Sequence, residues 1–271
     1  MSPVQCTVRK PGSSPVTGDP THRLSDERFA MPTALITGGT TGIGRATAEL
    51  LHARGYQVAV TGQNPDSLAR ARSELPGDVL VVRSDGRVLS DTDALMSAVS
   101  ARFGSLDLLF LNAGIFRPAP VTEVTEESFD EHADLNFKGQ YFTLQKALPL
   151  MNDGGSIVLT VGIGSRRGSP GATVGAATRG ALLAMLPSLA LELAPRRIRV
   201  NAVSPGATDT PLLDKLGVPG SGRDAMRSRI PFERFGSSQE VAEAVAFLAS
   251  DAAGYITGQD IAVAGGYGLG A

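Results

Sequence analysis

Residues 37–44 read Thr-Gly-Gly-Thr-Thr-Gly-Ile-Gly and lie between an apolar run at 33–37 and a helical pattern that begins near Ile43. Glycines at positions 38, 42 and 44 permit tight turns and close approach to a bound group, because they carry no Cβ. A helix N-terminus offers unpaired N–H groups and the positive end of its dipole to phosphates. The segment therefore predicts a site for the pyrophosphate of a dinucleotide, with a plain strand-to-helix turn as the alternative.

From Met31 onward, short β-branched and aliphatic runs alternate with helical segments, which is typical of βαβ units around a parallel sheet. Apolar residues at helical spacing place one stripe of each helix on that sheet. We expect one α/β domain over residues 31–271, with a Rossmann-type, doubly wound, seven-stranded parallel sheet. The predicted strands are residues 33–37, 57–61, 79–83, 106–111, 156–161, 198–203 and 260–263.

Two segments depart from this alternation. Residues 1–30 are rich in proline, serine, glycine and threonine without an apolar period, so we expect a disordered tail. Residues 209–231 are rich in glycine, proline and charge and lie where a substrate lid would be expected.

Composition argues against several kinds of partner. Lysine and arginine total 25, aspartate and glutamate total 27, and no basic run occurs, so we expect no nucleic-acid partner and no polybasic membrane anchor. The apolar run at 181–193 is interrupted by Pro187, Ser188 and Glu192 and is short of the roughly 20 residues of a membrane span. One cysteine and three dispersed histidines predict neither a disulfide nor a metal site. We expect a cytoplasmic protein that acts on a small molecule.

Together with later motifs, the glycine-rich turn resembles that of the short-chain dehydrogenase/reductase family. Asp85 resembles the family's adenine-contacting aspartate, followed here by Gly86 where valine or leucine is common. Residues 111–114, Leu-Asn-Ala-Gly, resemble the Asn-Asn-Ala-Gly turn beneath the adenosine ribose, and residues 201–211 resemble the segment that holds the nicotinamide carboxamide. Residues 255–266 resemble the closing strand, with Ala264 where an aspartate is usual.

The resemblance implies an NAD(P) cofactor. Residues 61–64 read Thr-Gly-Gln-Asn, so no carboxylate stands there to repel a 2′-phosphate, and the run is similar to the family's NADP-type Thr-Gly-Arg-Asn with Gln63 in place of arginine. NADP(H) is therefore favoured over NAD(H). The cofactor-binding residues implied are Gly38, Thr40, Thr41, Gly42, Ile43, Gly44, Gln63, Asp85, Gly86, Asn112, Ala113, Gly114, Arg179, Pro205, Gly206, Thr208 and Thr210.

The family's proton chemistry uses a serine, a tyrosine, a lysine four positions later, and an asparagine on an earlier helix. Asn136 lies at the asparagine position, but the alignment places Gly162 at the serine, Gly175 at the tyrosine and Arg179 at the lysine. Arg179 keeps the charge needed to bind ribose hydroxyls, whereas a guanidinium stays protonated and is no tunable proton donor. A positioned general acid is worth about 10²- to 10⁴-fold in rate, so the usual carbonyl reduction should be slower. The two glycines are expected to enlarge the pocket.

Nearby polar residues have plainer explanations. His132 lies one turn before Asn136, where a packed or partly exposed histidine is favoured over a stand-in acid. The loop after Gly162, the position aligned with the family's serine, contains Ser165, Arg166 and Arg167. It forms either an anion-binding site or a solvated loop.

Three functions stay open. The first is an NADP(H)-dependent oxidoreductase of atypical mechanism, acting on a bulky carbonyl or quinone-like substrate. The second is a non-redox enzyme, such as a cyclase or lyase, that reuses the fold. The third is a non-catalytic NAD(P)-binding sensor or scaffold. The resemblance also implies a homotetramer or homodimer.

Overall fold

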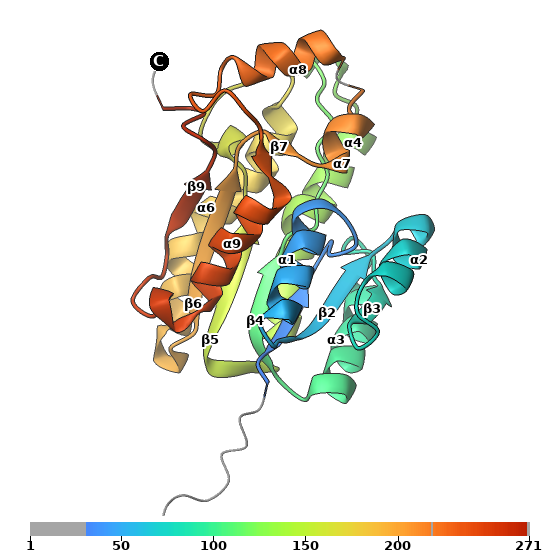
Figure 1. Cartoon of the computed structure of the whole chain (residues 1–271), viewed down its shortest axis with the longest axis vertical. Helices are drawn as coiled ribbons and strands as arrows, with labels where there is room; N and C mark the ends of the chain where they lie inside the picture. The colour runs from blue at the N-terminus through green and yellow to red at the C-terminus, as the bar shows by residue number, and fades with distance from the viewer. Residues whose placement is uncertain (1–30, 218, 270–271) are drawn as a thin grey trace, which may run out of the picture. The chain divides into compact units, whose positions relative to one another are not determined.

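The computed structural model describes residues 31–217 and 219–269, so the tail expected at residues 1–30 lies outside the described residues. Residues 31–269 hold a central sheet with helices on both faces (Figure 1). All neighbouring strands of this sheet are parallel, which confirms the predicted doubly wound α/β Rossmann fold with seven strands. In spatial order the strands are β3 (Leu80–Arg83), β2 (Gln57–Gly62), β1 (Thr33–Ile36), β4 (Leu106–Leu111), β5 (Met151–Thr160), β6 (Arg199–Pro205) and β9 (Asp260–Val263).

The strand boundaries agree with the sequence predictions to within a few residues, apart from β5. That strand begins at Met151 rather than at residue 156, because Met151 pairs with Leu106 of β4 before a register shift. The strand order reverses between β1 and β4, since β2 follows on one side of β1 and β4 on the other. Ligands of open α/β sheets bind at the carboxyl edge beside such a reversal, so this edge positions the candidate site.

The helices bury the two faces of the sheet in separate apolar clusters. One cluster, which includes Ile36, Val60 and Phe110, packs under α1 (Gly42–Ala53), α2 (Pro65–Glu74) and α9 (Ser238–Ala249). The other, which includes Leu35, Leu109 and Leu159, packs under α3 (Leu89–Phe103), α5 (Gly139–Ala147) and α6 (Thr173–Leu193). Neighbouring residues of one strand belong to opposite clusters, because side chains alternate across a sheet.

Helix α4 (Glu126–Ala133) continues into α5 through a π-helical turn, Asp134–Lys138. The predicted lid segment contains α7 (Pro211–Lys215) and α8 (Gly220–Arg227), which an ion pair between Asp214 and Arg223 connects. A short parallel pair, β7 (Thr208–Asp209) with β8 (Gly236–Ser237), joins the two ends of this segment. The chain on either side of the predicted lid segment is therefore held together by backbone pairing.

Helix α6 with its following turn, Thr173–Arg196, is long and apolar enough to span a membrane by length and composition alone. The expectation that this run is too short was therefore wrong on length, because Pro187 and Glu192 do not interrupt the helix. Its buried residues Leu182, Leu186 and Leu193 belong to the core cluster on the sheet. The structure thus uses α6 as a core helix.

Replacing Leu95 by alanine should lower the free energy of unfolding by about 2–5 kcal/mol, because its side chain is 1% exposed and packs in the core under α3. Ser100→Ala, on the exposed side of the same helix, should change it by less than about 0.5 kcal/mol. Chemical denaturation of both variants measures the difference. Equal stabilities would contradict the packing described.

Candidate functional site

The glycine-rich loop between β1 and α1 is shaped to receive a phosphate. Its close packing requires glycine at position 44, where a Cβ would overlap the backbone oxygen of Gly38. Helix α1 begins at Gly42, and the side chain of Thr41 before it caps no backbone N–H. The first turn therefore presents N–H groups without a side-chain acceptor, which is the arrangement that binds a pyrophosphate.

Asn112 fixes this loop to the ends of two neighbouring strands. Its amide nitrogen donates to the backbone oxygens of Thr37 and Gly38, each at 3.3 Å, and its Oδ1 accepts from the Thr160 hydroxyl at 3.1 Å. The Thr37 hydroxyl oxygen accepts from the backbone N–H groups of Asn112 at 2.9 Å and Ala113 at 3.1 Å. These hydrogen bonds consequently hold the glycine-rich loop and the ends of β4 and β5 together.

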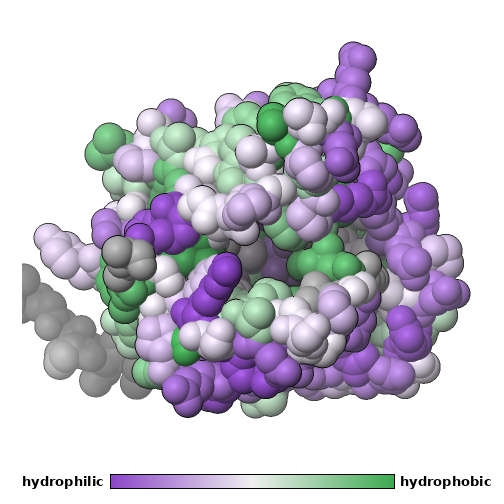
Figure 2. Space-filling model, turned by 90° about the horizontal axis from the view of Figure 1, so that it is seen from above, coloured by the Kyte–Doolittle hydropathy of each residue, from purple (hydrophilic) through white to green (hydrophobic). Residues whose placement is uncertain are grey.

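The segment after β6 lies over the same edge. The Gly206 N–H donates to the Val263 oxygen at 3.0 Å, and a Cβ at Gly206 would lie 2.8 Å from that of Ala264, so the small residue at 264 suits this contact. The Thr208 hydroxyl donates to the Gly206 oxygen at 3.1 Å, while Thr210 lies across from Gly42. Pro205, Gly206, Thr208 and Thr210 are therefore brought near the glycine-rich loop. Viewed from this edge, the surface is hollowed near its centre (Figure 2).

Two side chains predicted to bind the cofactor point into the protein. The Thr40 hydroxyl donates to Ser67 on α2 at 3.2 Å, and Ile43 packs against the core. These residues can serve a nucleotide through their backbone alone.

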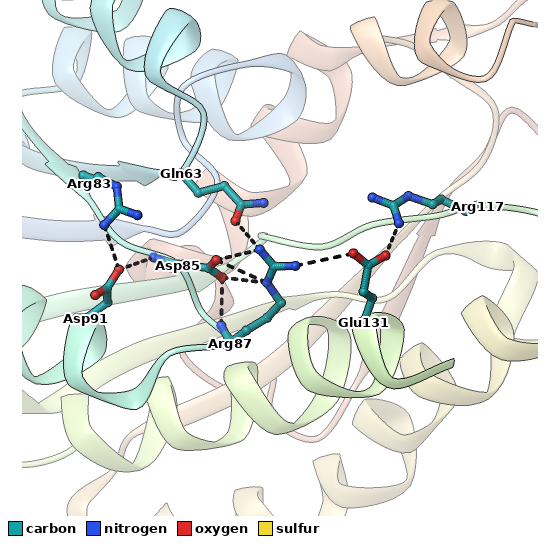
Figure 3. A network of polar contacts seen from close by, with 7 residues as sticks. All are labelled: Gln63, Arg83, Asp85, Arg87, Asp91, Arg117 and Glu131. Carbon is teal, nitrogen blue, oxygen red and sulfur yellow. Dashed lines mark hydrogen bonds and ion pairs between the residues drawn. The ribbon is translucent and has the colours of Figure 1, made fainter. Parts of the chain in front are cut away.

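At the β3 end of the edge, Asp85 is held by an arginine that the sequence analysis did not single out. Its carboxylate accepts from Nε of Arg87 at 2.9 Å and from Nη2 at 2.7 Å (Figure 3). These hydrogen bonds lower the pKa of Asp85 below its usual value. Gln63 accepts from the same Nη2 at 3.0 Å. Gly86, which stands between Asp85 and Arg87 in the chain, lies in contact with Leu135 and Gly139.

Arg179 reaches from α6 to the carboxyl ends of β4 and β5. Its guanidinium donates to the backbone oxygen of Thr160 at 2.7 Å and to that of Ala113 at 3.0 Å, while it packs against Gly114. No carboxylate among the described residues pairs with it, and burial lowers the pKa of Arg179 to about 10. It is therefore a partly desolvated cation that stays protonated at neutral pH.

Asn136 lies in the π-helical turn and is fully buried. Its Oδ1 accepts from the Ile115 N–H at 2.9 Å, and its Nδ2 donates to the Ile115 oxygen at 3.0 Å and to Thr178 at 3.2 Å. The side chain thus clamps the loop after β4 to α6. It is positioned to hold this loop rather than to move a proton itself.

A phenyl ring fills the space above the position predicted for the tyrosine. A Cβ at Gly175 would lie 2.7 Å from Cδ2 of Phe116, which comes from the loop after β4. The expectation that Gly175 enlarges the pocket is therefore wrong. At the position predicted for the serine, Gly162 has a φ of +103°, which side chains rarely adopt, and a Cβ there would have only the Pro205 oxygen, at 4.0 Å, within contact.

His132 is 1% exposed and packed, as favoured from the sequence. Its Nε2 accepts from the Arg117 N–H at 3.1 Å, and its Nδ1 lies 2.7 Å from the Ser128 oxygen. Both ring nitrogens are thus used in hydrogen bonds within the protein.

Arg166 and Arg167 line a cavity of about 230 Å³ together with Ile163, Ala262 and residues 264–269. Arg166 pairs at 2.8 Å with Asp260, whose side chain is 2% exposed, so its charge is compensated within the protein. This pairing favours the plainer explanation of the loop over an anion site. Within residues 31–217 and 219–269, no group of three or more histidine, cysteine, aspartate or glutamate side chains could hold a metal ion.

Comparison with known proteins identifies the family. A family model described as enoyl-(acyl carrier protein) reductase matches residues 38–268. The 3-oxoacyl-(acyl-carrier-protein) reductase FabG of Thermotoga maritima is 40% identical over 242 residues, which cover 86% of this chain and 96% of that protein. The chain belongs to the short-chain dehydrogenase/reductase family. The family predicted from the motifs is confirmed, and with it the class of NAD(P)-dependent oxidoreductases.

Other proteins are similar to this chain over most of its length. The cis-4-hydroxycyclohexanecarboxylate dehydrogenase of Sinomonas cyclohexanicum is 39% identical over 246 residues, covering 89% of this chain and 98% of that protein. A blue fluorescent protein from a metagenomic library, solved with NADPH, has a TM-score of 0.82 and 30% identity, covering 88% of this chain and 98% of that one. The 3-ketoacyl-(acyl-carrier-protein) reductase of Brucella melitensis, solved with NADH, has a TM-score of 0.81 and 32% identity, covering 88% and 98%.

Sequence reasoning missed Phe116, Thr178 and Arg87. Arg87 could have been noticed, because it is a cation two positions after Asp85. Phe116 and Thr178 gave no signal, since each acts through a contact with a residue far away in sequence.

Replacing Gly175 by alanine should destabilise the protein by about 1–3 kcal/mol, because the new Cβ would overlap the ring of Phe116. Gly180→Ala, on the same helix with no contact nearer than 4.0 Å, should be neutral or stabilising by up to about 1 kcal/mol. Chemical denaturation measures both, and Phe116→Leu combined with Gly175→Ala should recover part of the loss. A Gly175→Ala protein as stable as Gly180→Ala would show that the ring does not occupy this space.

Proposed function

We propose that this chain is an NADP(H)-dependent oxidoreductase that works without the serine, tyrosine and lysine of its family. The observation that carries the proposal is the phenyl ring of Phe116 above Gly175, on an edge whose glycine-rich loop keeps its phosphate-binding shape. The loop, Asn112 and the Pro205–Thr210 region support cofactor binding, while the ring occupies the space of a proton donor. The nucleotide-binding roles assigned from the sequence are part of this proposal.

The cofactor supplies the hydride. The residues of the chain therefore have to bind and orient the cofactor and the substrate, and to exclude water during hydride transfer. Arg179 provides a fixed cation beside Ala113 and Thr160, where it can donate to ribose hydroxyls and favour negative charge that develops nearby. With a pKa of about 10 it keeps its proton through the reaction at neutral pH. Asn136 and Thr178 hold the loop of Phe116 in place.

This arrangement suits a substrate whose reduced form needs no acid from the protein. A quinone-like or otherwise activated carbonyl gives a stabilised anion after hydride transfer, and bulk water can protonate this anion once it has left the site. The absence of close contacts in the Cβ direction of Gly162 favours a substrate with a bulky ring on that side. Phe116 narrows the site on the side of Gly175. The named substrates of relatives, a 3-oxoacyl group and a hydroxycyclohexanecarboxylate, support the class of carbonyl and alcohol compounds.

The proposal takes residues 31–271 as the functional domain of a cytoplasmic homodimer or homotetramer. Exposed apolar side chains on α4, the π-helical turn, α5 and α6 support an oligomer, namely Phe129, Phe137, Tyr141 and Leu191. No observation on the fold favours a cyclase or lyase.

Purified protein should bind NADPH, measured by fluorescence titration, and should oxidise it in the presence of quinones or cyclic diketones, measured by absorbance. Simple unactivated ketones should react about 10²- to 10⁴-fold more slowly, because no general acid is positioned for them. Binding without turnover on any substrate would instead identify a nucleotide sensor. Product without cofactor consumption would identify a non-redox enzyme.

Arg179→Ala should raise the dissociation constant for NADPH by about 10- to 100-fold, since a charge-assisted hydrogen bond to ribose is lost. Arg196→Ala is the matched control, because Arg196 also donates to two backbone oxygens, those of Leu148 and Met151, but away from the candidate site. Thermal melts separate lost binding from lost folding. An unchanged dissociation constant in a folded Arg179→Ala protein would refute the ribose role.

A further inference from the structure

Arg87 brings a cation to the end of β2, where the sequence has only the neutral Gln63. The side chain comes from the loop after β3 and is 34% exposed. It contacts Asp85 on its own loop, Gln63 beyond β2 and, at 3.7 Å, Glu131 on α4 (Figure 3). It thus links the ends of β2 and β3 to α4.

The hydrogen bonds between Arg87, Asp85 and Gln63 do not use all the N–H donors of these residues, so some can bind a ligand. Nε and Nη2 of Arg87 donate to Asp85 and Gln63, whereas Nη1 has only the loose ion pair with Glu131. Gln63 accepts through Oε1, and its amide nitrogen has no partner among the described residues. The two residues that carry these N–H donors, one charged and one neutral, are joined by the hydrogen bond of 3.0 Å from Arg87 Nη2 to Gln63 Oε1.

The carboxylates around Arg87 fix its place and leave part of its charge available. Glu131 also pairs with Arg117, so Glu131 is shared between two arginines. Asp91 pairs with Arg83 and accepts from the Asp85 N–H, which holds the loop that carries Arg87. The ion pair between Arg87 and Asp85 can be retained when an anionic ligand binds. The guanidinium of Arg87 is planar and can donate to two anions on different edges.

We propose that Arg87, together with Gln63, binds the 2′-phosphate of NADP(H) and determines the preference of this chain for NADP(H) over NAD(H). The proposal rests on the proposed function, because it requires a dinucleotide whose adenosine ribose lies at the end of β2. A phosphate dianion receives charge-assisted hydrogen bonds from Nη1 of Arg87 and a neutral one from Gln63. A 2′-hydroxyl receives much less from the same donors, since it carries no charge.

The test compares ligands that contain only the adenosine end. Calorimetry with 2′,5′-ADP and with 5′-AMP measures the contribution of the 2′-phosphate, and fluorescence titration repeats the comparison with NADPH and NADH. Wild-type protein should prefer 2′,5′-ADP and NADPH. Arg87→Gln should raise their dissociation constants by about 10- to 100-fold and those of 5′-AMP and NADH by less than about threefold. Arg87→Lys should lose less, because it keeps the charge.

Arg83→Gln is the matched control, because it removes one positive charge from the same network at a residue that pairs with Asp91 instead of Gln63. It should leave all four dissociation constants within about threefold. Thermal melts of each variant confirm folding. The wild-type preference for 2′,5′-ADP should also weaken as the pH falls from 7.5 to 5.5, because the second pKa of a phosphate is about 6.

The outcomes separate the two proposals. If Arg87→Gln weakens both nucleotides equally, or changes neither, Arg87 does not read the 2′-phosphate, although the proposed function stands. A loss of the preference in Arg83→Gln as large as in Arg87→Gln would also overturn the inference, since general charge would explain it. If wild-type protein binds neither NADPH nor NADH, the proposed function fails.

Discussion

The buried guanidinium of Arg179 is the constraint on which the candidate site depends. It joins the backbone oxygens of Thr160 and Ala113 across the ends of β4 and β5, and it has no carboxylate partner among the described residues. Removing a charge from water is unfavourable unless hydrogen bonds replace the lost hydration. Two carbonyls replace part of it, and the remaining N–H donors of Arg179 have no hydrogen-bond acceptor among the described residues. A bound ligand with hydroxyl groups would complete the set.

The other departures from the family pattern fit together around this cation. Gly175 leaves room for Phe116, and Asn136 holds the loop that carries Phe116 by bonding both backbone groups of Ile115. At Gly162 the positive φ means that a serine could not replace the glycine without backbone strain. A single substitution at any of these positions would therefore not rebuild a proton relay. The residues around these positions pack consistently with one another.

The two ends of the carboxyl edge differ in character. Near α6 the guanidinium of Arg179 bonds to two backbone oxygens, and the ring of Phe116 adds an apolar surface. Near β3 the edge is a network of charged side chains linked to one another, from Arg83 and Asp91 through Asp85 and Arg87 to Glu131. The charged end is suited to recognising a polar nucleotide, whereas the apolar end is suited to a reaction that excludes water.

The sequence by itself determined the fold and the family, because alternating apolar runs, helical spacing and the glycines at 38, 42 and 44 are local signals. It also predicts that Gly162, Gly175 and Arg179 stand at the positions of the family's serine, tyrosine and lysine. Only the tertiary structure placed Phe116 over Gly175, turned Thr40 toward Ser67 and brought Arg87 to Gln63. Each of these contacts joins residues 24 or more positions apart, the least being that of Arg87 and Gln63. Local pattern cannot specify such pairs, since the path of the intervening chain decides which side chains meet.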